Sequence, residues 1–109
     1  MKTQQSKAID NAMRKAKQHF GECIITTTQQ EIEGAHIFPR SNYPHLKAVP
    51  YNIVPLTPFL HNRLDKHQDG TIRRPADRIT FLRQHVNPEH RETLNQWLIE
   101  LLQIIAGAA

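Results

Sequence analysis

Residues 23–38 read CIITTTQQEIEGAHIF, and this stretch decides the fold class that the sequence predicts. It is rich in β-branched residues, which favour extended backbone, and a pair of glutamines interrupts it near the middle. The pattern predicts two short strands, roughly 23–28 and 31–38, that pair as a hairpin. His36 would then lie at the end of the second strand, between an alanine and an isoleucine.

Helices are predicted on both sides of this hairpin. Before it, apolar residues recur at spacings of four, three and four, and a glycine follows, which is typical of one helix face and its stop: Ile9, Met13, Ala16, Phe20 and Gly21. After it, residues 39–52 contain three prolines and show no period, so they are expected to form an irregular loop. Three helices should follow, each with a proline in its first turn: 57–67, 74–86 and 87–105.

The order of the predicted elements, with one hairpin among helices, is typical of an α+β fold, and the length predicts a single domain over residues 1–109. The chain has 109 residues, of which 39% are hydrophobic, so it can bury one modest core and is not a disordered tail. The single cysteine, Cys23, excludes an internal disulfide and a cysteine-rich zinc site, and it fits a reducing compartment. No signal-peptide core and no apolar run of transmembrane length occur in the sequence. We therefore expect a cytoplasmic protein with no membrane partner.

The charge balance favours a polyanionic partner. The formal net charge is +4, and seven histidines add positive charge in mild acid. Nucleic acid is the commonest polyanion that such a protein meets, although many small proteins that bind none are equally basic. Charge alone therefore raises the expectation of nucleic-acid binding only slightly.

Four polar residues after the predicted hairpin form a chemically suggestive set. His61 and Asp65 lie four positions apart on a predicted helix, so they share one face. An imidazole and a carboxylate at this spacing can hold one divalent cation together. His36 at the strand end could then act on whatever the cation holds, and Asn52 closes the loop between them. A core or surface histidine is the alternative for His36, and a helix-pairing carboxylate is the alternative for Asp65.

The segments GAHIFPRS (34–41) and YNIVPLTPFLHNRLD (51–65) resemble the HNH, or ββα-metal, nuclease motif. That motif has a histidine at a strand end followed by a proline, then an asparagine with an apolar pair and a leucine, and finally a histidine on a helix. The resemblance covers about 23–67, less than half of the chain. It implies a small ββα-metal core, a β-hairpin plus a helix, between helical extensions over 1–22 and 71–109.

The resemblance also implies roles for individual residues. By this resemblance the protein would be a DNA phosphodiester hydrolase, and His36 would be the general base that deprotonates a water. Asn52 would hold the loop and help to orient that histidine. His61 would bind one divalent metal, with Asp65 as a second ligand from the helix. Mg²⁺ or Mn²⁺ would suit such a site best, with Zn²⁺ or Ni²⁺ as alternatives.

One departure from the family pattern concerns the position before the base. Many members carry an aspartate or a histidine there that binds the metal, whereas this chain has Ala35. Glu33 lies one pleat back on the same side of the strand and would be the replacement ligand; otherwise it is a surface residue. If Glu33 does not bind the metal, the metal would keep extra waters, or metal binding would be lost. Ala35 thus favours the alternative function, a non-catalytic nucleic-acid-binding or assembly module with the same fold.

Two further expectations concern surfaces. Four arginines near the motif are predicted to contact nucleic-acid phosphates, with plain surface arginines as the alternative: Arg40, Arg63, Arg73 and Arg74. The C-terminal helix carries an apolar stripe that other residues widen: Leu94, Leu98, Leu101 and Ile105, with Trp97, Leu102 and Ile104. This broad surface predicts either a homodimer through that helix or coverage by the other helices of the same chain.

Overall fold

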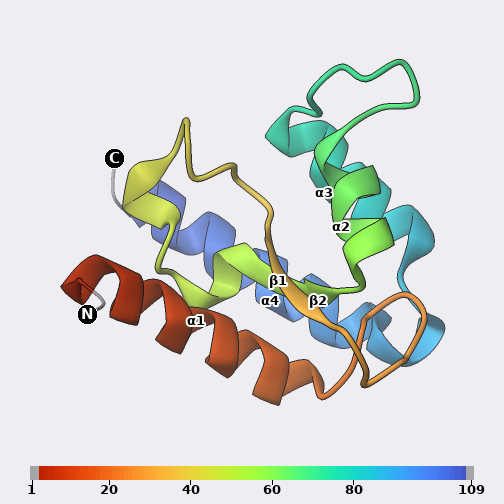
Figure 1. Ribbon diagram of the computed structural model, residues 1–109, viewed down its shortest axis with the longest axis horizontal. Coiled ribbons are helices and arrows are strands. Elements are labelled where there is room, and N and C mark those ends of the chain that lie inside the picture. The colour runs from red at the N-terminus through yellow and green to blue at the C-terminus, as the bar shows by residue number, and fades with distance from the viewer. Residues whose placement is uncertain (1–2, 108–109) are drawn as a thin grey trace.

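The computed structural model describes residues 3–107, in which four α-helices surround a two-stranded antiparallel sheet (Figure 1). The elements run in the order α1 (Gln4–Phe20), β1 (Glu33–His36), β2 (Ile53–Leu56), α2 (Pro58–Asp65), α3 (Pro75–His85) and α4 (Arg91–Gly107), with short 3₁₀ turns at Pro44–Leu46, Pro50–Asn52 and Pro88–His90. This architecture confirms the predicted α+β fold, a ββα core between helical extensions.

The composition of the hairpin differs from the sequence prediction. β1 pairs with β2, in the register Gly34 to Pro55 and His36 to Ile53, so the predicted strand 23–28 was wrong. Residues 23–28 instead form a tight turn, closed by the amide of Cys23 donating to the carbonyl of Thr28 at 2.9 Å.

The reason for this difference is burial. All four residues of β2 are buried, because α1 and α4 cover the sheet, whereas local β-propensity in 23–28 has no partner strand to satisfy it. Pro55 lacks an amide hydrogen, which a strand tolerates when one of its edges is left unpaired, as in this two-stranded sheet.

The helix boundaries agree with the sequence signals. Gly21 ends α1 in the left-handed region, at φ 79°, and its amide donates to the carbonyl of Lys17. The hydroxyl of Thr57 accepts a hydrogen bond from the amide of Leu60 at the start of α2. The carboxamide of Asn87 accepts from the amide of Glu89 ahead of α4. The predicted helices therefore exist within a few residues of their expected ends.

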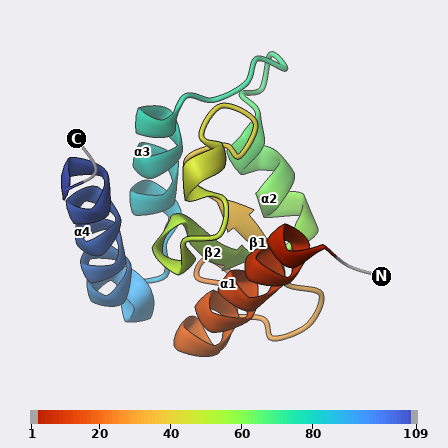
Figure 2. The ribbon, with the colours of Figure 1, turned by 90° about the vertical axis from the view of Figure 1, so that its left-hand side faces the viewer.

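Helix α1 lies directly against the strands, as Figure 2 shows. A Cβ added to Gly34 would lie 2.8 Å from Cγ of Met13 and 3.0 Å from a methyl carbon of Ile53. The bare backbone of β1 at this position is therefore what allows α1 to approach so closely.

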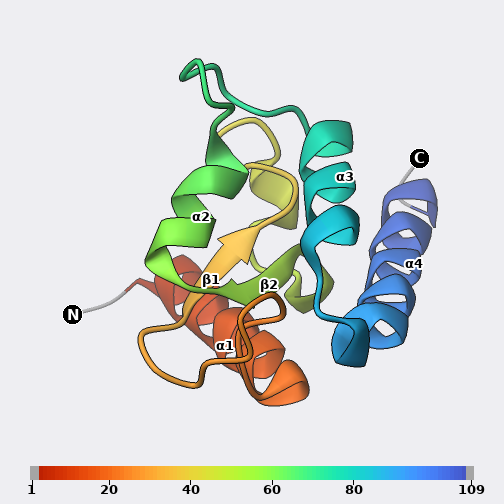
Figure 3. The ribbon, with the colours of Figure 1, turned by 90° about the vertical axis from the view of Figure 1, so that its right-hand side faces the viewer.

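Helix α4 lies beside α3 and contributes apolar side chains to the same core (Figure 3). The indole nitrogen of Trp97 donates to the carbonyl of Ile53 at 2.9 Å, which ties α4 to the strand. Within the predicted stripe, Leu94, Leu98 and Leu101 are buried by the chain itself. Ile105 is partly buried, and the large hydrophobic residues that α4 leaves exposed are Ile99, Leu102 and Ile104. Across residues 3–107, no helix has the length and apolar character needed to cross a membrane.

Candidate functional site

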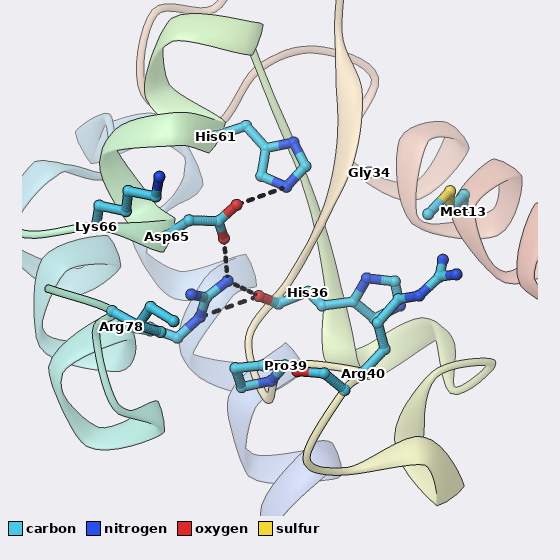
Figure 4. A pocket seen from close by; sticks show the side chains of 11 residues that line it. Met13, Gly34, His36, Pro39, Arg40, His61, Asp65, Lys66 and Arg78 are labelled. Atoms are coloured by element: carbon cyan, nitrogen blue, oxygen red, sulfur yellow. Dashed lines mark hydrogen bonds and ion pairs between the residues drawn. The ribbon is translucent and has the colours of Figure 1, made fainter. Parts of the chain in front are cut away.

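A cleft of about 390 Å³ opens between α1, the end of β1, the loop after it, and α2 (Figure 4). Four of the predicted site residues line it: His36, Arg40, His61 and Asp65. Arg40, Lys66 and Arg78 give the same cleft its positive charge, and the remaining lining residues are Met13, Gly34, Pro39, Ser41 and Ile72. The cleft therefore brings together residues from four separate parts of the chain, between Met13 and Arg78.

His61 lies between two carboxylates. Its Nδ1 is 2.8 Å from Oε1 of Glu33, and its Nε2 is 3.7 Å from Oδ2 of Asp65. When Nδ1 carries the proton and donates it to Glu33, the lone pair of Nε2 is left facing the aspartate. Carboxylates hold metal-binding histidines in this way and make the ring a better ligand. Glu33 thus contacts Nδ1, the ring nitrogen that does not face Asp65, and this contact suits a supporting role better than direct binding of the metal.

The donor set fits a divalent cation that needs few protein ligands. Nε2 of His61 and Oδ2 of Asp65 approach one another on one helix face, as the spacing predicted. Within residues 3–107, no three or more His, Cys, Asp or Glu side chains are grouped as a metal cage. A cation such as Mg²⁺ commonly uses one or two protein ligands and fills its other positions with waters and phosphate oxygens. Ala35 is fully buried in the core, so the position before His36 does not face the cleft.

His36 is a buried, neutral imidazole held by the main chain. Its Nε2 lies 2.8 Å from the carbonyl oxygen of Lys47, so Nε2 carries the proton and donates it. Burial lowers the pKa of His36 below its ordinary value, and the positive charges of Arg40 and Arg78 lower it further. The hydrogen bond to Lys47 opposes this shift without cancelling it. The ring is therefore unprotonated at neutral pH and keeps a lone pair on Nδ1.

The His36 ring and the His61–Asp65 pair approach the cleft from different walls. Figure 4 shows the ring on the Arg40 and α1 side of β1, and the His61–Asp65 pair across the ribbon of that strand. The main-chain carbonyl of His36 points the other way, towards Arg78. A substrate that reaches both groups must therefore span the cleft beside Gly34, which has no side chain to block it.

Asn52 is fully buried and does not line the cleft. Its Oδ1 accepts from the amide of Phe38 at 2.8 Å, and its Nδ2 donates to the carbonyls of Phe38 and Leu46, both at 3.1 Å. Leu46 precedes Lys47, whose carbonyl accepts from the His36 ring. Asn52 therefore holds together the loop that carries the carbonyl of Lys47, and its orienting effect on His36 stays a prediction.

Arg78 is the site residue that the sequence analysis missed. Its side chain is only 4% exposed, and its guanidinium donates to the carbonyl of His36 at 2.6 Å and to Oδ1 of Asp65 at 2.6 Å. It also donates to the carbonyl of Leu64 at 3.4 Å. One buried cation thus ties the end of β1 to the end of α2. The spacing could have indicated that Arg78 is buried, because it lies on the same face of α3 as the apolar residues Phe81 and Leu82.

The four arginines predicted to contact nucleic acid are not grouped in one patch. Arg40 is exposed and lines the cleft, and Arg74 is exposed at the start of α3. Arg63 lies with its guanidinium 6.0 Å from the ring centre of Phe59, on the helix face opposite His61. The guanidinium of Arg73 is turned onto the protein, where it donates to the carbonyl of Arg63 at 2.9 Å and lies over the ring of Phe81.

Comparison with known proteins identifies the central segment. Residues 23–69 match the family model of HNH endonucleases, which confirms the resemblance seen in the sequence. The matched span contains both strands and α2, and with them His36, His61 and Asp65. Neither a curated protein nor a solved structure matches the chain.

Proposed function

We propose, from the HNH endonuclease domain over residues 23–69, that this protein is a metal-dependent endonuclease that hydrolyses phosphodiester bonds in DNA. The observation that carries the proposal is the cleft, which joins a neutral histidine to a histidine–aspartate pair within the matched span. The basic residues at its edge, Arg40 and Lys66, suit a phosphate backbone.

His36 is the general base in this proposal. Its Nδ1 accepts a proton from a water, while the carbonyl of Lys47 holds the Nε2 proton and so fixes the tautomer. The water oxygen then bonds to phosphorus as the phosphorus–oxygen bond to the leaving alkoxide breaks. The lowered pKa of His36 keeps the ring in the required form at neutral pH.

The divalent cation would be held by His61 and Asp65, with Mg²⁺ or Mn²⁺ best suited to this donor set. When bound, such a cation neutralises the phosphate and stabilises the leaving oxygen. Glu33 orients His61, and Arg78 keeps Oδ1 of Asp65 engaged so that Oδ2 faces the cation. Arg40 contacts the phosphate near the base, and Arg63 and Arg74 contact flanking phosphates, while Arg73 joins the segment after α2 to the carbonyl of Arg63.

Metal binding at this site is tested by thermal melting with Mn²⁺. A ligand at about 100 times its Kd raises the free energy of unfolding by about 2.7 kcal/mol, so wild type should melt at a higher temperature in Mn²⁺. His61→Ala should lose this stabilisation, and Asp65→Asn should lose less of it. His45→Ala, at an exposed histidine outside the cleft, is the control and should respond like wild type. Equal stabilisation of His61→Ala by Mn²⁺ would remove the metal site.

A non-catalytic DNA-binding module is the second candidate function. The observations that favour it are the burial of Ala35 and the lack of a third metal ligand within residues 3–107. Such a module would bind DNA and cut none with any metal, whereas the proposed enzyme cuts. A cleavage assay beside a binding assay therefore separates the two.

We also propose a homodimer, through a narrower surface than the sequence suggested. Trp97 and Leu101 are buried within the chain, so the interface would use Ile99, Leu102 and Ile104. Sedimentation equilibrium at micromolar concentration should then give a dimer that Leu102→Glu dissociates into folded monomers, because a charge in an apolar interface is costly. A strictly monomeric wild type would contradict the dimer.

A further inference from the structure

The side chain of Ile72 lies at the mouth of the cleft instead of in the core. It is 72% exposed, more than any other large hydrophobic residue that the described chain leaves exposed. A single exposed apolar residue on a smooth surface would need no explanation. Ile72, however, lines the same cleft as His61, Asp65 and Lys66. A molecule bound in that cleft would therefore touch an apolar side chain.

The turn that presents Ile72 is fixed by its own hydrogen bonds. Ile72 pairs with Lys66 in an antiparallel bridge, and the amide of His67 donates to the carbonyl of Thr71 at 2.8 Å. Oδ1 of Asp69 accepts from both the amide and the hydroxyl of Thr71, at 2.9 and 2.7 Å. Gly70 supplies the left-handed residue that the turn requires, at φ 87°. The turn 66–72 projects from the body of the protein between α2 and α3 (Figure 1).

The same turn is joined to the proposed metal ligand. The amide of Arg73 donates to the carbonyl of Asp65 at 3.0 Å, and its Nε donates to the carbonyl of Arg63 at 2.9 Å. Ile72 is therefore held between its bridge to Lys66 and this contact. Its position relative to Asp65 is set by the main chain, so an apolar side chain stands at a fixed place beside the proposed metal ligand.

The charges around Ile72 suit nucleic acid as the partner. Lys66 and Arg74 are exposed on either side of it, and Arg40 lies on the cleft as well. The carboxylate of Asp69 accepts two hydrogen bonds from Thr71, which lower its pKa, so it stays negative within this otherwise basic surface. An apolar tip with cations beside it complements a DNA groove, where bases lie between two rows of phosphates.

We propose that turn 66–72 enters a groove of the substrate duplex and that Ile72 inserts beside the scissile phosphate and partly unstacks the bases there. This inference rests on the proposed function. Apolar wedges such as isoleucine separate base steps and kink the duplex in this way. The energetic cost is smallest at flexible pyrimidine–purine steps and at mismatches, so those sites are cut preferentially.

Paired cleavage assays test the wedge. Two DNA substrates share one sequence, and in one of them an unpaired bulge has already unstacked the bases. Ile72→Ala should lower cleavage of the fully paired duplex by about tenfold and change cleavage of the bulged substrate little, because the protein no longer supplies the unstacking. Ile72→Leu keeps an apolar tip and should cut the paired duplex nearly as well as wild type. Gln18→Ala, at an exposed residue of α1 outside the cleft, should alter neither rate.

A binding measurement keeps this test separate from catalysis. In His36→Ala, which prevents cutting, saturating binding to a duplex containing 2-aminopurine should raise its fluorescence, and adding Ile72→Ala should remove the rise. If wild type cuts no DNA but the rise depends on Ile72, the nuclease proposal fails and the wedge stands. The wedge is overturned if Ile72→Ala slows both substrates equally or neither, if fluorescence does not depend on Ile72, or if the protein binds no DNA.

Discussion

His36→Ala should lower the rate of DNA cleavage by about 10²–10⁴-fold, the usual contribution of a positioned general base. The variant loses the only proton acceptor that the proposal assigns to the attacking water. It also removes a buried ring and leaves the carbonyl of Lys47 without its donor, so its free energy of unfolding should fall by about 1–3 kcal/mol. Single-turnover cleavage and urea denaturation measure the two effects. His45→Ala is the matched control, and a wild-type rate in His36→Ala would show that His36 is not the base.

The pH dependence follows from the same residue. The general base must be unprotonated, and burial together with neighbouring positive charge lowers the pKa of His36 below 6.5. The acid limb of the cleavage profile should therefore lie below pH 6.5. Because the folded state resists protonation, stability is full above pH 6.5 and is lost as the pH falls towards the folded pKa. An acid limb above pH 6.5 would be inconsistent with His36 as the titrating group.

Arg78→Met should cost about 3 kcal/mol of folding free energy, the lower part of the range for breaking a buried ion pair. The side chain of Arg78 is 4% exposed, and its loss leaves the buried carbonyl of His36 without its donor. The side chain of Asp65 is 43% exposed and can be hydrated, which moderates the cost. Urea denaturation measures the loss. Arg83→Met, at an exposed arginine of the same helix, should change stability by less than about 0.5 kcal/mol.

The effect of Arg78 on the site can be separated from its effect on the fold. Arg78→Lys keeps the charge but not the fork that reaches His36 and Asp65 together, so it should recover only part of the stability. Mn²⁺ binding should weaken in Arg78→Met at temperatures where the variant is still folded, since Asp65 loses the partner that orients it. If Arg78→Met is as stable as Arg83→Met, the buried arginine does not join β1 to α2.

The sequence predicted the parts of the site that depend on local spacing. His61 and Asp65 share a face because they are four positions apart on a helix with clear end signals, and the strand containing His36 precedes a proline-rich loop. The second strand was missed because its proline resembles a loop residue, while 23–28 has stronger β-propensity. Pairing is decided by which segment α1 and α4 can bury with β1, and local propensity carries no information about that.

Contacts between elements that are distant in the sequence could not be predicted from residue spacing either. Arg78 bonds to a carbonyl 42 residues away, and Glu33 contacts a ring 28 residues away. Neither partner can be read from spacing within one element. Asn52 was predicted as a loop-holding residue from the family resemblance, and its three hydrogen bonds to Phe38 and Leu46 show how it holds the loop.

The most direct measurement is cleavage of supercoiled plasmid DNA by the purified protein with Mg²⁺, Mn²⁺, Zn²⁺ or Ni²⁺, and with a chelator. Nicked or linear DNA should form with at least one of these ions, above all Mg²⁺ or Mn²⁺, and none should form with the chelator or with His36→Ala. Intact plasmid under every metal condition, with the protein folded and bound to the DNA, would contradict the nuclease and support a non-catalytic DNA-binding module.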